Sequence, residues 1–527
     1  MSYWDHLLLG MHSAIFGAQF DLFGLAIPLT PVMVIMGFIL GVMVGATPGL
    51  AGPIALAVAL PILISIFGYE MTALLPVLGF MIGIMKGSTI GGAVPAILFN
   101  TPGTPDAYMT TLDGHPMAKN GEAKQALKVA HFSSVSGDTF SDLMLFICAP
   151  FLAIIVEAYL DLPEKAALMI LSLAFIAAVS GKSPAKGIIA MAFGLFVATI
   201  GTGEDFYPRL SLGSPALADG LPIAAVVLGS LVLGEIFSNL GKLYQANDDT
   251  RQSLNQRQRG WVSLGWPLRK KLLPYILNSA FIGTVVGALP GIGSTLAATM
   301  GYTAGNRFHE RHKQASEPSF GSGAPQGVAA TEAANSAVSG ANLIPVLSLG
   351  IPGNVAAVFL LLAMDSIGGF NPGPSVFILP NEGTNPELVI AFGLFTAMVM
   401  ANLLNWVIGG RLMTAMAFMN LIPKHILMPA ILLVTMTAIY VQTPSFNAIL
   451  ITLFFGLIGY AMRRLGVPIL PFVIAFILAR NLETAARQAF SATGADHWFL
   501  FSSWTATAFM LIAATIVIYN LRPKKTS

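Results

Sequence analysis

Long apolar stretches recur along the chain, and Pro-Gly pairs interrupt several of them. A membrane-crossing helix needs about 20 apolar residues. Only 10% of the 527 residues are charged, against about 25% in a soluble domain. The composition therefore predicts an all-α polytopic membrane protein and disfavours a soluble enzyme, a nucleic-acid-binding protein or a disordered scaffold. We expect about 10–14 membrane segments, drawn from 22–45, 50–68, 72–98, 140–160, 166–180, 186–201, 220–238, 272–289, 387–410, 428–442, 446–461, 467–480 and 498–519.

The N-terminus lacks the basic residues of a secretion signal, because the first Lys or Arg is Lys86. Apolar residues of the segment 2–20 recur at three- and four-residue spacing. This spacing predicts an interfacial amphipathic helix over 1–20, lying on the lipid bilayer surface. A frayed terminus before the first span is the alternative.

Basic residues gather in two places, which predicts the orientation in the membrane. The segment 242–271 holds seven Lys and Arg residues, and the C-terminus holds Arg522, Lys524 and Lys525. The N-terminal flank instead carries Asp5 and Asp21. We therefore expect 242–271 and the C-terminus to be cytoplasmic and the N-terminal flank to lie outside.

Two sequence patterns occur twice in the same order. Gly45, Ala46, Pro48, Gly49 and Ala55 recur in 287–297, and Pro95, Pro102 and Gly103 recur as Pro345, Pro352 and Gly353. Chance similarity between Gly/Pro-rich stretches is the alternative. With the charge bias, the repeat predicts two inverted halves, an architecture typical of secondary transporters. The expected organisation is a first transmembrane repeat over 21–241, a linker over 242–271, a second repeat over 272–497, and an extra span with its tail over 498–527.

Four Pro-Gly pairs divide the apolar stretches: Thr47-Pro48-Gly49, Thr101-Pro102-Gly103, Leu289-Pro290-Gly291 and Ile351-Pro352-Gly353. Proline removes a backbone donor and glycine permits unusual backbone angles, so these positions should break helices. The stretch 327–365 should accordingly form half-helices. Exposed helix N-termini attract anions, and freed carbonyls can bind sodium. Kinks that serve only helix packing are the alternative.

Small polar residues and a few charges lie beside these breaks. Ser88, Thr89, Asn100, Thr101, Asn335, Ser336 and Asn342 are candidate ligands of a substrate carboxylate, with Lys86 as counter-ion. The alternatives are contacts between helices for the small polar residues and snorkelling to the interface for Lys86. Thr47, Pro48, Gly49, Pro290, Gly291 and Glu332 are candidate cation ligands. For Glu332, a structural hydrogen bond is the alternative. Asp138 and Asp142 are expected to be solvated residues at the start of a span.

Several enzymatic signatures are absent. The sequence contains no Gly-x-x-x-x-Gly-Lys-Ser/Thr nucleotide loop, no His-Glu-x-x-His zinc motif and no Gly-x-Ser-x-Gly nucleophile turn. Its single cysteine, Cys148, excludes an internal disulfide framework and a cysteine-built metal cluster. We expect neither enzymatic activity nor a cofactor.

The run from Gly87 to Pro105 resembles a signature of the large membrane subunit of tripartite tricarboxylate transporters. The pattern continues in Asp113-Gly114-His115-Pro116, in 320–335 and in Leu349-Gly350-Ile351-Pro352-Gly353. The resemblance extends from about residue 20 to about residue 500. One departure is Ser336, where the family commonly has a second Asn after Asn335.

The resemblance implies a secondary transporter of the bacterial inner membrane. Its partners would be a small membrane subunit and a periplasmic solute-binding protein, which delivers citrate or another carboxylate. Sodium would be the coupling ion, and no nucleic acid would be involved. A homo-oligomer is left open. Broken helices also build selectivity filters, so a passive anion channel is the alternative.

Overall fold

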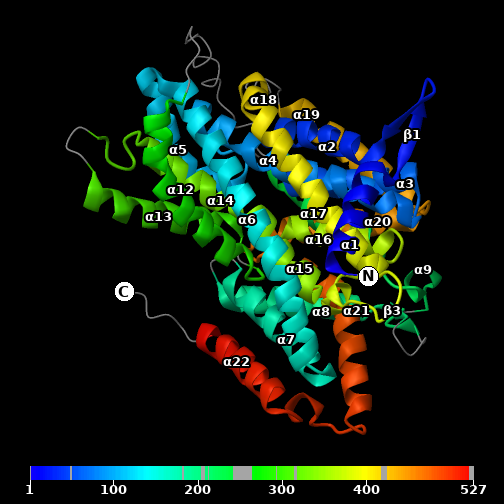
Figure 1. Cartoon of the computed structure of the whole chain (residues 1–527). Coiled ribbons are helices and arrows are strands. Elements are labelled where there is room, and N and C mark those ends of the chain that lie inside the picture. Colours follow the sequence, from blue (N-terminus) through cyan, green and yellow to red (C-terminus); the bar gives the residue numbers. More distant parts are fainter. Residues whose placement is uncertain are drawn as a thin grey trace. The chain divides into compact units, whose positions relative to one another are not determined.

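The computed structural model of the chain describes residues 2–47, 50–180, 183–202, 208–211, 213–240, 264–291, 293–313, 317–416 and 424–521. Helices account for most of these residues, and the strands are short (Figure 1). The chain divides into two compact units. The first contains 1–153, 245–289 and 293–427, and the second contains 154–244, 290–292 and 428–527.

The first unit contains most of the broken helices. It begins with α1 (Tyr3–His12), η1 (Ser13–Gly17) and a hairpin of β1 (Gln19–Leu22) and β2 (Leu25–Pro28), which pair antiparallel. Its first set of helices is α2 (Leu29–Gly45), α3 (Gly52–Phe67), α4 (Met71–Phe99), η2 (Pro105–Ala107), α5 (Tyr108–Met117), η3 (Ala118–Glu122) and α6 (Ala123–Tyr159). Its second set is α12 (Trp266–Gly287), α13 (Ser294–His312), α14 (Pro325–Ala341), α15 (Leu343–Leu349), α16 (Val355–Ser366), η8 (Pro374–Phe377), α17 (Pro386–Leu404), η9 (Asn405–Gly409) and α18 (Gly410–Ala415). The last residues of α6 belong to the second unit.

The second unit combines segments that follow each of these sets. Its elements are α7 (Leu162–Val179), α8 (Pro184–Ala198), β3 (Gly201–Thr202), β4 (Pro208–Arg209), α9 (Pro215–Ala218), α10 (Ile223–Leu228), η4 (Gly229–Leu233), α11 (Gly234–Leu240), α19 (Lys424–Gln442), α20 (Phe446–Arg464), α21 (Ile469–Ala492), η11 (Phe499–Phe501) and α22 (Trp504–Leu521). Within it, α7 packs along α22, and α8 along α21. The compact units thus take one part from each half of the sequence and do not follow the repeat boundaries, which stay a prediction. The linker 242–271 lies largely outside the described residues.

The predicted fold class is confirmed. Among the described residues, six helical segments are long and apolar enough to cross a membrane, and shorter apolar helices accompany them. The stretch 327–365 forms the separate helices α14, α15 and α16, as its prolines and glycines predicted. The protein is therefore a multi-pass helical membrane protein. The number of segments that cross, and the inversion of the two halves, stay predictions.

Glycines allow α2 and α4 to approach each other with backbones in contact. A Cβ atom built on Gly41 would lie 2.5 Å from the carbonyl oxygen of Ile84, and one on Gly87 would lie 2.3 Å from that of Phe38. The pair α12 and α14 packs in the same manner, since a Cβ on Gly283 would lie 2.3 Å from the carbonyl oxygen of Ala334. Small residues at an interface are the usual means of close helix packing in membranes.

Replacement of Gly87 by Ala should therefore separate α2 from α4. Overpacking costs about 1–3 kcal/mol, which exceeds the gain of about 1 kcal/mol from the better helix propensity of Ala. The measurement is thermal unfolding of the purified protein in detergent. Gly373→Ala is the control, because nothing lies within 4 Å of a Cβ at Gly373. Equal melting temperatures for the two variants would contradict this account of the packing.

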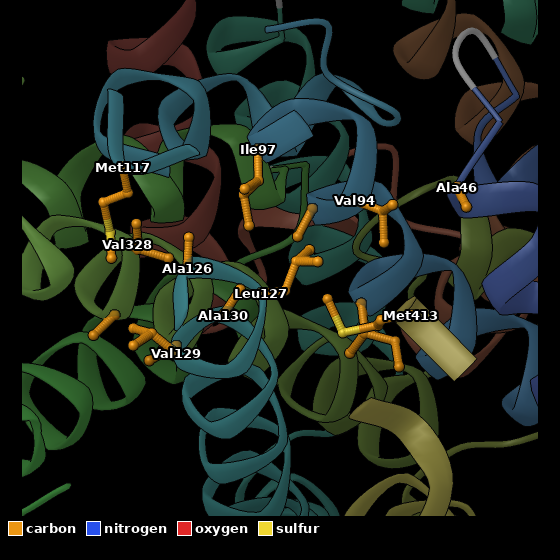
Figure 2. Close-up of a cluster of buried hydrophobic side chains, with 14 of the residues drawn as sticks. Ala46, Val94, Ile97, Met117, Ala126, Leu127, Val129, Ala130, Val328 and Met413 are labelled. Carbon is orange, nitrogen blue, oxygen red and sulfur yellow. The ribbon is translucent and has the colours of Figure 1, made fainter. Parts of the chain in front are cut away.

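Buried apolar side chains from both sets of helices form the core of the first unit. The cluster includes Val94 and Ile97 from α4, Leu127 and Ala130 from α6, and Val328 from α14 (Figure 2). Such burial of apolar surface against protein is what fixes α4, α6 and α14 relative to one another.

The chain turns in the same way after α4 and after α15. Asn100 and Gly350 both adopt left-handed backbone angles, with φ of 52° and 70°. The next amide then donates back to a proline carbonyl, from Thr101 to Pro95 over 3.3 Å and from Ile351 to Pro345 over 3.2 Å. These hydrogen bonds are typical of a helix C-terminus. The two halves therefore share local structure, 250 residues apart, where their sequences repeat.

The two Pro-Gly pairs that follow these turns lie between helices. Pro102 and Gly103 follow α4, and Pro352 and Gly353 follow α15. A Cβ on Gly103 would lie 2.3 Å from the carbonyl oxygen of Gly45, and one on Gly353 would lie 3.6 Å from that of Gly287. Gly103 thus lies at the C-terminal end of α2, and Gly353 lies at that of α12. These are the first helices of the two predicted transmembrane repeats.

The N-terminal segment forms a helix, α1, that packs against α17. The imidazole of His6 is buried and accepts a hydrogen bond from the Asn385 amide over 3.0 Å, and the Tyr3 hydroxyl donates to the Phe377 carbonyl over 2.6 Å. Trp4 and Leu8 on the other face are exposed by 74% and 63%. These contacts hold α1 against α17, and contact of its exposed face with lipid stays a prediction.

Candidate cation and carboxylate sites

The polar residues of the first unit gather where α6 runs beside α14. A Cβ on Gly137 of α6 would lie 2.3 Å from the carbonyl oxygen of Ala333 of α14, so the two backbones touch. Every residue of α14 from Gln326 to Ala341 is buried. Polar side chains on α14 are consequently surrounded by protein, where an unpaired polar group is costly.

Glu332 on α14 is a buried carboxylate held by hydroxyl groups. One of its oxygens accepts a hydrogen bond from Thr110 of α5, and the other accepts one from Ser134 of α6 over 2.9 Å. Within the described part of the chain, no Lys, Arg or His pairs with Glu332. An ionised carboxylate in such a place needs a compensating positive charge. Oxygen atoms of a carboxylate and of hydroxyl groups are the ligands that hard cations prefer.

Polar atoms of Asn335 and Ser336 on α14, and of Asn342 directly after this helix, have no partner among the described residues. Both amide atoms of Asn335, both amide atoms of Asn342 and the Ser336 hydroxyl are buried without a hydrogen bond among the described residues. Buried polar groups are hydrogen-bonded in the great majority of cases. Unpaired amides can donate to a carboxylate or coordinate a cation. This row therefore has the chemistry of a ligand site, and it begins one helical turn after Glu332.

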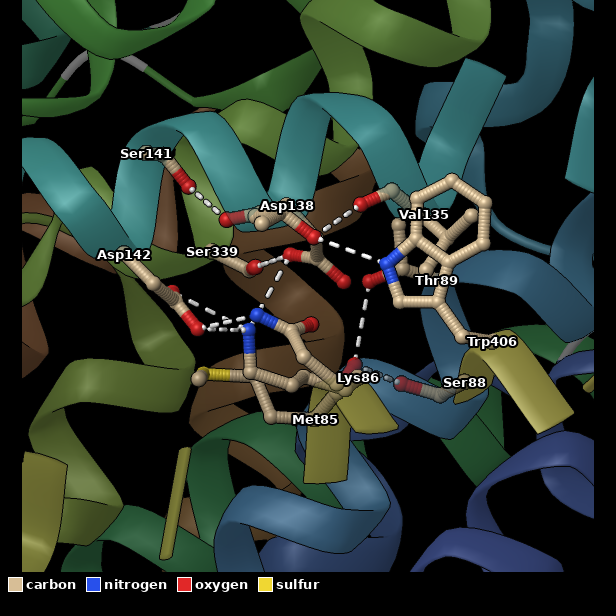
Figure 3. A network of polar contacts seen from close by, with 12 residues as sticks. Met85, Lys86, Ser88, Thr89, Val135, Asp138, Ser141, Asp142, Ser339 and Trp406 are labelled. Atoms are coloured by element: carbon tan, nitrogen blue, oxygen red, sulfur yellow. Dashed lines mark hydrogen bonds and ion pairs between the residues drawn. The ribbon is translucent and has the colours of Figure 1, made fainter. Parts of the chain in front are cut away.

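Lys86 lies in a cluster with two aspartates from α6 (Figure 3). Its ammonium nitrogen is 3.3 Å from Asp138 Oδ1 and 2.8 Å from Asp142 Oδ2, and the Lys86 side chain is completely buried. Ser339 of α14 donates to Asp138, and Asn402 of α17 donates to Asp142 over 2.6 Å. The expectation that Asp138 and Asp142 are solvated is wrong, because both lie inside α6 against three other helices. Burial also excludes snorkelling of Lys86, whose charge is paired within the protein.

Asp113 connects α5 to the loop that precedes α14. Asp113 Oδ1 accepts hydrogen bonds from the amides of Gly321, Gly323 and Ala324 over 2.8–3.0 Å. Its other oxygen accepts one from the Tyr302 hydroxyl over 3.0 Å. Burial and the Asp113 carboxylate raise the pKa of Tyr302, which keeps its hydroxyl as a donor. The two motifs around Asp113 and Phe320 thus form one structural contact that positions α14.

The other predicted ligands are scattered. The hydroxyls of Ser88 and Thr89 both donate to the Met85 carbonyl within α4. Thr47 likewise donates to the Met43 carbonyl. Asn100 and Thr101 are exposed at the end of α4, where Thr101 donates to the Phe99 carbonyl.

The structure describes only some of the predicted cation ligands, and these belong to different compact units. Pro48 and Gly49 lie outside the described residues. Pro290 and Gly291 belong to the second compact unit, where a Cβ on Gly291 would lie 2.7 Å from Ile176. Glu332 is the predicted cation ligand whose carboxylate is held by other side chains, the hydroxyls of Thr110 and Ser134. Neither Thr110 nor Ser134 was among the predicted site residues. No group of three or more His, Cys, Asp or Glu that could hold a metal ion occurs among the described residues.

The polar residues in and directly after α14 differ from those at the corresponding positions of the first half. At the offset of 250 residues, Glu332, Asn335 and Asn342 correspond to Ile82, Met85 and Gly92. Ser336 corresponds to Lys86. The two halves share their turns but differ in chemistry, so the unpaired amides of α14 have no counterpart on α4.

These features define a class, a multi-pass membrane protein with buried charged and polar sites between broken helices. Residues 32–474 match the tripartite tricarboxylate transporter TctA family. The chain belongs to this family and is a subunit of a tripartite tricarboxylate transporter. The family is one of transporter components, which act with a small membrane subunit and a periplasmic binding protein.

Two relatives from Agrobacterium vitis are similar in sequence. An uncharacterised 52.8 kDa protein in the TAR-I ttuC′ 3′ region is 29% identical over 507 residues, covering 95% of each chain. An uncharacterised protein in the TAR-II ttuC′ 3′ region is 29% identical over 244 residues, covering 46% of this chain and 94% of its own length. No solved structure matches the chain.

Proposed function

We propose that this subunit imports a carboxylate by cation-coupled alternating access. The observation that carries the proposal is Glu332, a buried carboxylate without a basic partner in the described chain, one helical turn before the unpaired amide of Asn335 on the same helix. A site that needs a cation and offers free donors suits co-binding of a cation and an anion. The substrate is citrate or a related di- or monocarboxylate.

Sodium is the coupling ion that we propose for Glu332. The surrounding oxygens of Thr110 and Ser134, with the unpaired Asn335 Oδ1 one turn further along α14, form a donor set that fits a hard monovalent cation. A bound cation would compensate the carboxylate and attract the substrate's negative charge. The two ligands would then bind cooperatively, which is the thermodynamic basis of coupling.

A periplasmic solute-binding protein is proposed to deliver the substrate in the bacterial inner membrane. The basic linker 242–271 and the C-terminus would face the cytoplasm, as the charge bias favours. The two halves would be inverted, and a unit carrying both ligands would expose them alternately.

The test is uptake of radiolabelled citrate and a panel of di- and monocarboxylates into proteoliposomes. The chain is co-reconstituted with its small membrane subunit and its binding protein, with and without an inward sodium gradient. Uptake that requires both sodium and the binding protein is the expected result. Flux that ignores the gradient and needs no binding protein would instead favour a passive anion channel.

Asn335→Ala should abolish this uptake and leave membrane insertion intact, because it removes both unpaired amide atoms beside Glu332. No hydrogen bond within the described chain is lost, so the folding cost should be small. Asn447→Ala in α20 is the control, because Asn447 lies in the second unit. Uptake by Asn335→Ala at the wild-type rate would contradict the assignment of Asn335 to the substrate site. Asn100→Ala, at the exposed end of α4, tests the first repeat in the same assay.

A further inference from the structure

The cluster of Lys86, Asp138 and Asp142 contains two acidic side chains and one basic side chain, so one negative charge is left uncompensated when both aspartates are ionised. Lys86 is the one basic side chain that pairs with the two aspartates among the described residues. All three side chains are at most 9% exposed. With both aspartates ionised, the cluster would hold a net charge of about −1 in an environment where an uncompensated charge costs several kcal/mol.

The two aspartates differ in how their oxygens are satisfied. Both carboxylate oxygens of Asp142 contact the Lys86 ammonium, and Oδ2 also accepts a hydrogen bond from the Asn402 amide. Oδ1 of Asp138 contacts the Lys86 ammonium and accepts a hydrogen bond from Ser339, whereas its Oδ2 is buried with no hydrogen-bond partner among the described residues. The uncompensated charge and the unpaired oxygen therefore coincide at Asp138 Oδ2.

A proton fits this position better than a metal ion. The Lys86 ammonium already lies within 3.3 Å of both carboxylates, so a second cation would be placed next to a like charge. A proton needs no additional ligand and no additional volume. The proton forms an O–H bond on Asp138, whose carboxylate lies further from the Lys86 ammonium than that of Asp142 does.

Other titratable groups lie further along the same helices. The helices that pack against the cluster contribute Ser339 from α14 and Asn402 from α17, which do not titrate near neutral pH. Glu332 lies two turns before Ser339 on α14, and its carboxylate is directed to Thr110 and Ser134. His131 lies two turns before Asp138 on α6 and contacts the Asn405 carbonyl.

We propose that Asp138 takes up and releases one proton, so that the Lys86–Asp138–Asp142 cluster is a proton site separate from the cation site at Glu332. The proton comes from water and returns to water, and Oδ2 is the atom that carries it. Protonation brings the cluster from one net negative charge to neutrality. The neutral form is the one that can move through an apolar environment at low cost.

The inference extends the proposed function, but its first test does not require transport. Infrared difference spectra of the purified full chain are recorded between alkaline and acidic pH, where a protonated carboxyl group gives a band distinct from that of a carboxylate. Exposed carboxyl groups all contribute on acidification, and the wild type should gain in addition a carboxyl band from the buried Asp138. Asp138→Asn should lose this band, and Asp365→Asn, which removes an exposed carboxylate, should retain it.

Asp142→Asn provides a second variant if Asp138→Asn does not fold. It leaves a neutral pair of Lys86 and Asp138, so the band should again be absent. The double variant Lys86→Met with Asp142→Asn restores the net charge of −1 and should restore the band. A wild type without the band, or a band that persists in Asp138→Asn, would overturn the proposal.

A transport measurement then separates this inference from the proposed function. In the citrate-uptake assay, acidification outside should stimulate the wild type, and Asp138→Asn should lose the stimulation while uptake still depends on sodium. Equal stimulation of both proteins would overturn a role of Asp138 in proton coupling. A wild type that takes up no carboxylate would refute the proposed function, whereas the infrared result would still decide whether Asp138 is protonated.

Discussion

Glu332→Gln should strongly reduce sodium-driven carboxylate uptake. The replacement keeps the size of the side chain and removes its charge. A hydrogen bond or contact to a charged group contributes about 1.5–3 kcal/mol, which corresponds to a cation affinity about 10- to 100-fold weaker. Measured at sodium concentrations near half-saturation of the wild type, uptake should fall accordingly and should recover in part at high sodium.

The same replacement should leave the fold intact. Gln can still accept a hydrogen bond from Thr110 or Ser134. The replacement also removes a buried charge that has no basic partner in the described part of the chain. Melting temperature in detergent should therefore stay equal or rise. Glu164→Gln is the matched control, since Glu164 is a buried glutamate of the second unit that accepts a hydrogen bond from Thr505 over 3.2 Å. If Glu332→Gln kept the sodium dependence of the wild type, Glu332 would not be the cation ligand.

Lys86→Met should be the most destabilising single substitution described for this protein. It leaves Asp138 and Asp142 buried next to each other without their ammonium partner. Removing one partner of a buried ion pair typically costs about 3–5 kcal/mol, which is a large part of the stability of most proteins. The variant should be poorly expressed or should melt at a much lower temperature in detergent.

A charge-neutral variant separates this electrostatic effect from the packing of the lysine chain. Lys86→Met combined with Asp138→Asn and Asp142→Asn removes all three charges and should regain most of the lost stability. Lys165→Met is the control, because Lys165 pairs with Glu157 at 2.8 Å where both side chains are more than 30% exposed. Such a pair contributes at most about 1 kcal/mol. Similar decreases in melting temperature for Lys86→Met and Lys165→Met would show that burial does not strengthen the contribution of the Lys86 ion pairs to stability.

The helix ends illustrate what was predictable from sequence. Pro95, Pro102 and Gly103 recur as Pro345, Pro352 and Gly353, and the chain indeed leaves a helix before each Pro-Gly pair. The left-handed turn at Asn100 and Gly350 follows from the preference of Asn and Gly for positive φ. Such features depend on a few adjacent residues and are therefore visible in the sequence.

The candidate sites were predictable only in part. Glu332, Asn335 and Asn342 stood out as polar residues in an apolar stretch, and all three are buried on α14 or at its end. Thr110, Ser134 and Asn402 were missed, although a polar face of α6 with Ser134, Asp138 and Asp142 at four-residue spacing could have indicated them. The same spacing was interpreted as a solvated helix end, because no local signal shows that another helix covers it.

The sequence by itself determined that the chain is a helical membrane protein, where its helices break, and which family it belongs to. Hydropathy, Pro-Gly pairs and ordered motifs are properties of short segments, so they act wherever the segment lies. Only the tertiary structure decided that Lys86 pairs with Asp138 and Asp142, that Glu332 is held by two hydroxyls, and that Asp113 holds the start of α14. Each of these charges lies at least 50 residues from its partners along the chain. Their pairing is set by the close packing of α4, α5, α6 and α14, because a buried charge takes its partner from whichever helix the fold places beside it.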